Sequence, residues 1–164
     1  MKKLVYYLAK IEAFYSVVVF MIVFCVMVWQ VLARVVFNVP NAWSEELTRF
    51  LCFSVVFFGA SIAIDEETHI RIDGLLSLYP EKSRIFIALL GYAVMFLYTL
   101  FVIYFGWRFT MGSWKMGTIA PSLGGIKMWV FYISLPISHF CMAIHIVDVM
   151  IRIIKRKSWQ IVAA

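Results

Sequence analysis

The sequence contains few charged residues. Only 15% of its 164 residues are charged, and 64% are hydrophobic. A soluble domain usually has about 25% charged and about 45–50% apolar residues. A soluble chain of this length would need more polar surface to cover its core. This shortage of charge excludes an ordinary soluble domain and indicates that lipid surrounds most of the chain.

Sequence motifs for catalysis and metal binding are also lacking. There is no GxGxxG, no phosphate-binding loop and no HExxH. The three cysteines lie inside apolar runs without CxxC or Cys/His spacing, which favours small buried hydrophobes over metal ligands: Cys25, Cys52 and Cys141. We therefore predict that the chain is not an enzyme and has no catalytic residue, metal site or cofactor of its own.

The chain instead has four long apolar runs, at about 14–33, 47–64, 85–107 and 128–151. Each is close to the ~20 residues that a helix needs to cross a bilayer. No charged residue lies at the centre of any run. The first run is too long for a cleaved signal peptide and indicates a retained signal anchor. The predicted fold is a single all-α integral membrane domain over residues 1–164, with four transmembrane helices.

The basic residues predict the orientation of these helices. A net charge of +6 could suggest nucleic acid, but here the basic residues stand at the ends of apolar runs, where they act as topology signals and contact anionic lipids. Ten lie on the side of the two termini and the central loop, and five lie on the other side. The positive-inside rule therefore places both termini in the cytoplasm. Tryptophans mark the predicted outer boundary as an aromatic belt: Trp29, Trp43, Trp107, Trp114 and Trp129.

Three segments outside the spans have recognisable patterns. In the central loop, apolar residues at positions 72, 75, 76 and 79 share one helix face, and Pro80 follows, which predicts a short interfacial amphipathic helix. The first residues show a similar apolar face at positions 4, 8, 11 and 15. The loop at 112–126 is rich in Gly, Ser and Pro, so we expect it to be irregular and exposed.

A cluster of polar residues lies on the predicted outer side, around the start of the second helix. Ser44 can cap that helix, and Glu45 and Arg49 are spaced to form an ion pair. Two interpretations remain open: a well-capped helix entry, or a binding surface that also includes the end of the first helix. The cluster comprises Arg34, Asn38, Asn41, Trp43, Ser44, Glu45, Glu46 and Arg49.

Two features of the spans bear on function. His139 lies near the middle of the fourth span, three residues after Pro136; a functional role competes with a neutral imidazole bonded to a neighbouring helix or to carbonyls that the proline frees. Nearer the cytoplasmic end, residues 145, 148 and 152 share one face and predict a local ion and hydrogen-bond cluster. Small residues offer surfaces for close helix approach: Gly59 and Ala63, and Ala88 and Gly91.

Taken together, these residues resemble a known family. The run VLARVVFNVPNAWSEELTRFLCFSVVFFGASIAIDEETHIRIDGL is similar to the small membrane subunit (Q subunit, of the DctQ or SiaQ type) of tripartite ATP-independent periplasmic (TRAP) transporters. The resemblance rests on a tryptophan-acidic-arginine pattern, a Phe-Gly-Ala stretch, a His/Asp pair and a second signature near the fourth span: Arg34, Phe37-Asn38, Trp43-Ser44-Glu45-Glu46, Arg49, Phe58-Gly59-Ala60, His69, Asp73, Trp129, Tyr132 and Pro136.

The resemblance implies a scaffold in the bacterial inner membrane. A large M subunit would carry the sodium and substrate sites, and a periplasmic P subunit would deliver an organic acid such as a C4-dicarboxylate or a sialic acid. Arg34, Glu45, Glu46 and Arg49 are then candidate contacts for the periplasmic partner. Residues with a structural or interface role would be Trp43, Gly59, Ala63 and His139.

Two other functions compete with this one. The first is a small proton-coupled carrier that acts as a homo-oligomer, with His139 in the proton path. The second is a haem-binding membrane protein with His139 and His145 as axial ligands. Two histidines six residues apart on one helix cannot face a single haem from opposite sides, which argues against the second.

Overall fold

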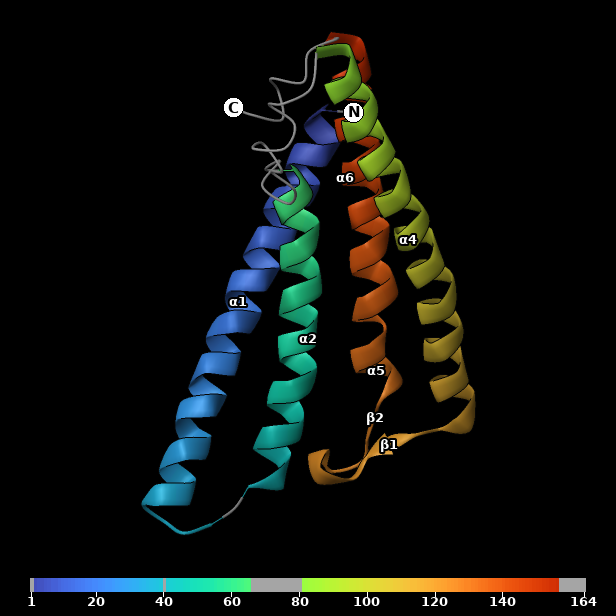
Figure 1. Cartoon of the computed structure of the whole chain (residues 1–164). Helices are drawn as coiled ribbons and strands as arrows, with labels where there is room; N and C mark the ends of the chain where they lie inside the picture. Colours follow the sequence, from blue (N-terminus) through green and yellow to red (C-terminus); the bar gives the residue numbers. More distant parts are fainter. Residues whose placement is uncertain (1, 40, 66–80, 157–164) are drawn as a thin grey trace.

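The computed structural model describes residues 2–39, 41–65 and 81–156. Four long helical passages run side by side (Figure 1). They are α1 (Lys2–Val35), α2 (Ala42–Asp65), α4 (Glu81–Met116) and a fourth passage made of α5 (Trp129–Tyr132) and α6 (Ser134–Arg156). All four passages are long and apolar enough to cross a membrane. The predicted all-α membrane fold with four spans is confirmed.

The helices extend beyond the apolar runs. α1 starts at Lys2, well before the predicted boundary at residue 14, and α4 continues to Met116 instead of ending near residue 107. The helix indicated by the apolar positions 4, 8, 11 and 15 is therefore continuous with the first span. No Gly or Pro interrupts α1, so its backbone hydrogen bonds continue without a break. The interfacial helix expected at 72–79 lies outside the described residues.

α6 is the central helix of the bundle. α2 and α4 both pack on α6, and α1 packs mainly on α2. A buried apolar cluster joins α2 to α6, and partly buried residues of α4 pack against it. Its members are Ile64 of α2 and Met142, Ile146, Val149 and Ile153 of α6. Most large apolar side chains of α1 and α4 face outward instead, as expected where lipid is the solvent. Cys141 is buried, but Cys25 is exposed on α1, so the interpretation of all three cysteines as buried hydrophobes is wrong for Cys25.

The fourth passage is interrupted at Ile133. Pro136 has no N–H to donate to the carbonyl of Tyr132, which is why regular hydrogen bonding lapses here. The hydroxyl of Ser134 donates to the carbonyl oxygen of Phe131 at 2.7 Å and bridges the interruption. α4 packs closely against this point, since a Cβ on Gly106 would lie 3.2 Å from a methyl carbon of Leu135.

The connection between α4 and α5 is an ordered hairpin. β1 (Ile119–Ala120) pairs antiparallel with β2 (Ile126–Lys127) around the 3-10 helix η1 (Pro121–Leu123). Ala120 is fully buried, and η1 packs on α2. The prediction of an irregular loop at 112–126 is wrong, because α4 occupies its first part and a hairpin the rest. The predicted exposure is confirmed for most of these residues, with Ser113 and Ala120 buried.

Candidate functional sites

All five described tryptophans lie toward one end of the bundle. Trp29 is near the end of α1, and Trp43 is at the start of α2. Trp107 and Trp114 lie in the last part of α4, and Trp129 begins α5. We call this the tryptophan end. The opposite end, where α1 begins and α6 ends, is called the terminal end (Figure 1).

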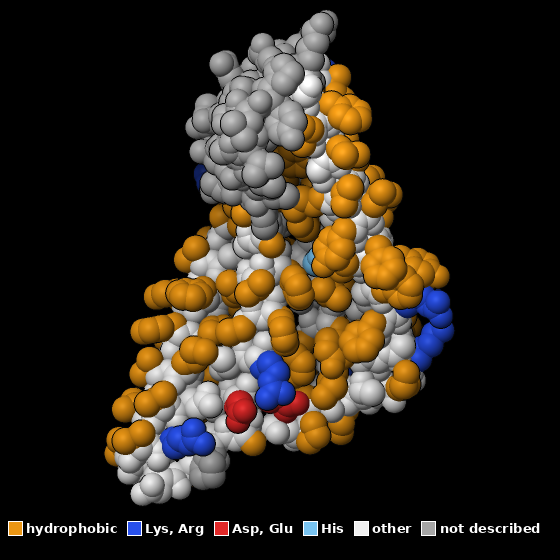
Figure 2. All heavy atoms as spheres, viewed as in Figure 1, with side chains coloured by type: hydrophobic (Ala, Val, Ile, Leu, Met, Phe, Trp, Pro, Cys, Tyr) orange, Lys and Arg blue, Asp and Glu red, His pale blue; other side chains and the backbone are white. Residues whose placement is uncertain are grey.

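The candidate contact residues are at the tryptophan end. Arg34 is exposed in the last turn of α1. On α2, Arg49 and Glu45 form the predicted ion pair at 3.5 Å, with both side chains about two-thirds exposed. Figure 2 shows acidic and basic side chains side by side near this end, and further Lys or Arg side chains higher up at the edges of this face. The structure thus places Arg34 and the Glu45–Arg49 pair on one end of the molecule, available to a partner.

The start of α2 differs from the predicted cap. α2 begins at Ala42, so Ser44 lies inside the first turn and not at the cap. Its buried hydroxyl donates to the carbonyl of Asn41 at 2.8 Å. The chain reaches this start through Asn38, whose φ of 52° is in the left-handed region that asparagine tolerates. Nearby, Trp43 is 40% exposed. One carboxylate oxygen of Glu46 is buried without a hydrogen-bond partner in the described part of the chain.

A second polar cluster, which the sequence analysis did not find, lies toward the terminal end. Oε2 of Glu12 on α1 is 3.0 Å from Nε2 of His145 on α6. The hydroxyl of Ser61 on α2 donates to both oxygens of the same carboxylate, at 3.1 and 3.3 Å. Glu12 is 2% exposed, and Ser61 and His145 are fully buried. We call Glu12, Ser61 and His145 the buried triad; it joins three helices through one carboxylate.

The buried triad changes the interpretation of the α6 face. His145 was expected to cluster with Asp148 and Arg152, but its ring reaches across to α1. Asp148 and Arg152 do form an ion pair, at 2.6 Å. One sequence signal pointed to Glu12: it is a single acid just before an apolar run. Within the described residues, no group of three His, Cys, Asp or Glu side chains is arranged to hold a metal ion, so the triad is a hydrogen-bonded cluster and not a metal site.

His139 is held mainly by its own helix. Its Nδ1 is 2.9 Å from the carbonyl oxygen of Leu135, one turn earlier. This is not the Tyr132 carbonyl that Pro136 frees. The ring is 5% exposed and lies edge-on to Phe57 of α2, with a centroid distance of 5.4 Å. The geometry therefore shows a packed imidazole bonded within α6.

The small residues of α2 and α4 face open space. A Cβ added to Gly59 would meet nothing within 4 Å, and the same holds for Gly91. Ala63, one turn after Gly59, is half-buried. These positions therefore do not bring helices together inside the chain as Gly106 does, and the surface at Gly59 stays available for a partner.

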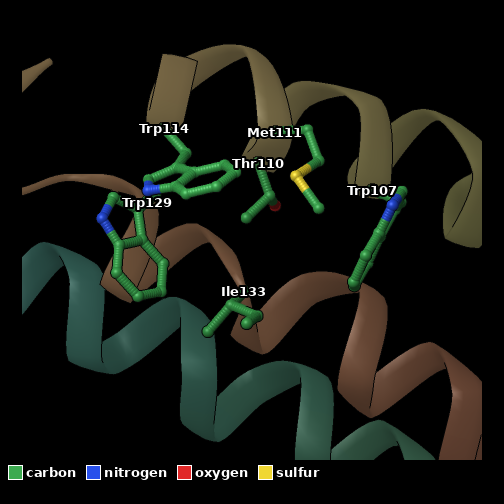
Figure 3. A pocket seen from close by; sticks show the side chains of 6 residues that line it. All are labelled: Trp107, Thr110, Met111, Trp114, Trp129 and Ile133. Atoms are coloured by element: carbon green, nitrogen blue, oxygen red, sulfur yellow. The ribbon is translucent and has the colours of Figure 1, made fainter. Parts of the chain in front are cut away.

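An apolar pocket of about 420 Å³ opens at the tryptophan end, between α4 and the start of the fourth passage (Figure 3). No cationic side chain lines it, and the hydroxyl of Thr110 already donates to the carbonyl of Gly106 at 2.8 Å. The indole N–H groups of three tryptophans are its other donors, but no cation is present to neutralise the charge of an organic acid anion. Its lining is Trp107, Thr110, Met111, Trp114, Trp129 and Ile133.

The comparison with protein families agrees with this arrangement. The family model described as "Tripartite ATP-independent periplasmic transporters, DctQ component" matches residues 23–156, which is most of the chain: the second half of the first span and the other three spans. The chain belongs to the DctQ family. It is therefore a permease component of a TRAP transporter and not an enzyme. The match includes the Glu45–Arg49 pair, Ser61 and His145, but it begins after Glu12.

Two relatives of the chain are named for sialic acid transport. The sialic acid TRAP transporter permease protein SiaT of Haemophilus influenzae is 36% identical over 131 residues, which cover 76% of this chain and 20% of SiaT. The sialic acid TRAP transporter small permease protein SiaQ of Vibrio cholerae is 34% identical over 80 residues, or 49% of this chain and 46% of SiaQ. The chain thus matches about a fifth of one relative and just under half of the other.

Proposed function

We propose that this DctQ component is the scaffold subunit of a sodium-coupled TRAP transporter in a bacterial inner membrane. A large M subunit carries the sodium and substrate sites, and a periplasmic P subunit delivers the substrate. The substrate is an organic acid anion of the C4-dicarboxylate or sialic acid type. The names of SiaT and SiaQ favour the sialic acid type.

The observation that carries this proposal is the placement of charge. In the described residues, three of the four candidate contacts, Arg34, Glu45 and Arg49, are exposed at the tryptophan end, and Glu12 is tied to Ser61 and His145. Transporters bind ions and substrates near the bilayer midplane, on intramembrane charges and discontinuous helices. Here the interruption at Ile133 lies only four residues from Trp129, at the tryptophan end, and the midplane carries no described Asp, Glu, Lys or Arg. This placement of charge supports a chain that leaves ion and substrate binding to its M subunit.

The length of SiaT supports a large membrane partner. A region similar to this chain makes up a fifth of that permease protein. If the M subunit is a separate chain, as proposed here, it would correspond to the other four fifths of SiaT. The open space at Gly59 then favours close approach by a partner helix.

Reconstitution into liposomes tests the proposal. The chain alone should take up no organic acid, whereas the chain with its M subunit, P subunit and a sodium gradient should take it up. Uptake by the purified chain alone would rule out the scaffold role and favour the proton-coupled homo-oligomeric carrier. In that alternative His139 lies in the proton path, so His139→Gln should then abolish the uptake.

We also propose that both termini are cytoplasmic and that the tryptophan end faces the periplasm. The distribution of basic residues supports this orientation. A reporter that is active only in the periplasm should be silent when fused after residue 164 and active when inserted in the hairpin between β1 and β2. The reverse pattern would overturn the orientation and remove Arg34 as a contact for the P subunit.

A further inference from the structure

Three aromatic rings from three helices meet near the middle of the bundle. Phe57 of α2 and Tyr98 of α4 flank His139 of α6, with ring centroids 5.4 and 6.4 Å from the imidazole. We call these three residues the midplane seam. His139 is ten residues past Trp129, or about 15 Å along a helix, and the hydrocarbon core is about 30 Å thick. The midplane seam therefore lies at the greatest distance from water on either side.

The imidazole of His139 has an acceptor left over. Its Nδ1 is 2.9 Å from the Leu135 carbonyl oxygen, which can only accept, so we assign the hydrogen to Nδ1. The hydroxyl of Ser138 donates to the same carbonyl at 3.0 Å. Nε2 of a neutral ring is then an acceptor, and no described residue donates to it. The side chain that carries this acceptor is more than nine-tenths buried.

The hydroxyl of Tyr98 is a hydrogen-bond donor at the same depth. Tyr98 is nine residues before Trp107, so its depth matches that of His139, and its side chain is 58% exposed. No described residue bonds to its hydroxyl. Tyrosine usually lies at the membrane boundary with its hydroxyl toward water. A hydroxyl at the midplane has no water to bond and needs a protein group.

The outer face of α1 shows a different pattern at the same depth. Its exposed residues are apolar, among them Val17, Val18 and Met21. Such a face suits lipid without any partner. Position 91 of α4, two turns before Tyr98, is moreover an exposed glycine with open space around it, which lets a neighbouring helix approach closely.

We propose that the midplane seam is where a transmembrane helix of the M subunit docks. This inference rests on the proposed function and adds the contact site. The docking helix carries a Ser, Thr, Asn or Gln that donates to Nε2 of His139 and accepts from the hydroxyl of Tyr98. Each of these neutral side chains can both donate and accept a hydrogen bond.

Photo-crosslinking in the assembled complex tests the site. The photoreactive residue p-benzoylphenylalanine is placed at position 98 and, as a matched control, at position 14, where Phe14 is 73% exposed on α1. Position 98 should give at least fivefold more crosslinked M subunit than position 14. Equal yields, or a crosslink from position 98 to a second copy of this chain, would overturn the docking site. If wild-type chain does not co-purify with the M subunit at all, the proposed function fails instead.

A single-atom change measures the hydrogen bond. Tyr98→Phe should lower retention of the M subunit in mild detergent by about three- to fifteenfold, the range measured for hydrogen bonds between membrane helices. Tyr104→Phe is the control, because Tyr104 is similarly exposed but lies three residues from Trp107. The thermal stability of the chain alone should be the same in both variants. Equal retention in the two variants would show that the Tyr98 hydroxyl meets no partner.

Discussion

Two of the carboxylate pairs in the described residues have opposite surroundings. Glu45 and Arg49 meet on the surface of α2, about two-thirds exposed and four residues apart. Glu12 and His145 meet inside the bundle, 133 residues apart, with side chains 3% and 0% exposed. Exposed pairs contribute about 0–1 kcal/mol because water screens them. Removing one partner of a buried pair costs about 3–5 kcal/mol, since the other partner is left without compensation.

This contrast separates stability from recognition. The buried triad ties α1 to α2 and α6, and no partner could reach it without opening the bundle. The Glu45–Arg49 pair adds little to stability and leaves its charges free to rearrange toward a partner. The two regions should therefore respond differently to the same kind of substitution.

Removal of the buried carboxylate should have the largest effect. Glu12→Ala leaves His145 and Ser61 without their shared acceptor, and we expect a loss of about 3–5 kcal/mol in the free energy of unfolding. Thermal unfolding of the purified chain in detergent measures this. Glu45→Ala serves as the control and should change stability by less than about 1 kcal/mol. Equal losses of unfolding free energy in the two variants would show that the buried and the exposed pair contribute alike to stability.

Loss of the serine hydroxyl should have an intermediate effect. Ser61→Ala removes one donor to the carboxylate of Glu12 and leaves the bond from His145 in place. A hydrogen bond to a charged group contributes about 1.5–3 kcal/mol, so the loss should be smaller than that of Glu12→Ala. In the Glu12→Ala background, the same serine substitution should cost much less, because its acceptor is already gone. Additive losses would mean that Ser61 acts independently of Glu12.

Charge reversal at the tryptophan end should affect uptake and not stability. Arg34→Glu should raise the P subunit concentration needed for half-maximal uptake on the order of tenfold, equivalent to about 1.4 kcal/mol. Proteoliposome uptake at increasing P subunit concentration measures it, with Arg108→Glu on α4 as the matched reversal. Loss of the M subunit from the purified complex would show instead that Arg34 is structural.

Removal of the exposed cation should have the smallest effect on stability. Arg49→Ala breaks the ion pair with Glu45, and we expect a change below about 0.5 kcal/mol, as for other i, i+4 helix pairs. High salt should not alter the difference from wild type beyond error. A loss as large as that of Ser61→Ala would contradict the assignment of this pair to recognition.

The sequence predicts the fold well and the buried triad poorly, for one physical reason. Each transmembrane helix is predicted by its own apolar residues, because lipid solvates each span separately. The Glu45–Arg49 pair was also predicted, since four residues of one helix determine it. Glu12 pairs with residues 49 and 133 positions away, and only the packing of three helices brings them together. The hairpin was missed for a similar reason, because η1 packs on α2, which lies far away in the sequence.

The lengths of α1 and α4 have a consequence for the membrane itself. Their apolar spans contain 31 and 32 residues, or about 46 and 48 Å at 1.5 Å per residue, against a hydrocarbon thickness of about 30 Å. To fit entirely within that thickness, each helix would have to tilt by roughly 50° from the bilayer normal, beyond the usual range of tilts. Figure 1 shows these two helices diverging from the terminal end toward the tryptophan end. The chain is thus a wedge that occupies more area in one leaflet than in the other, and it should favour bilayers whose thickness and curvature accommodate that asymmetry.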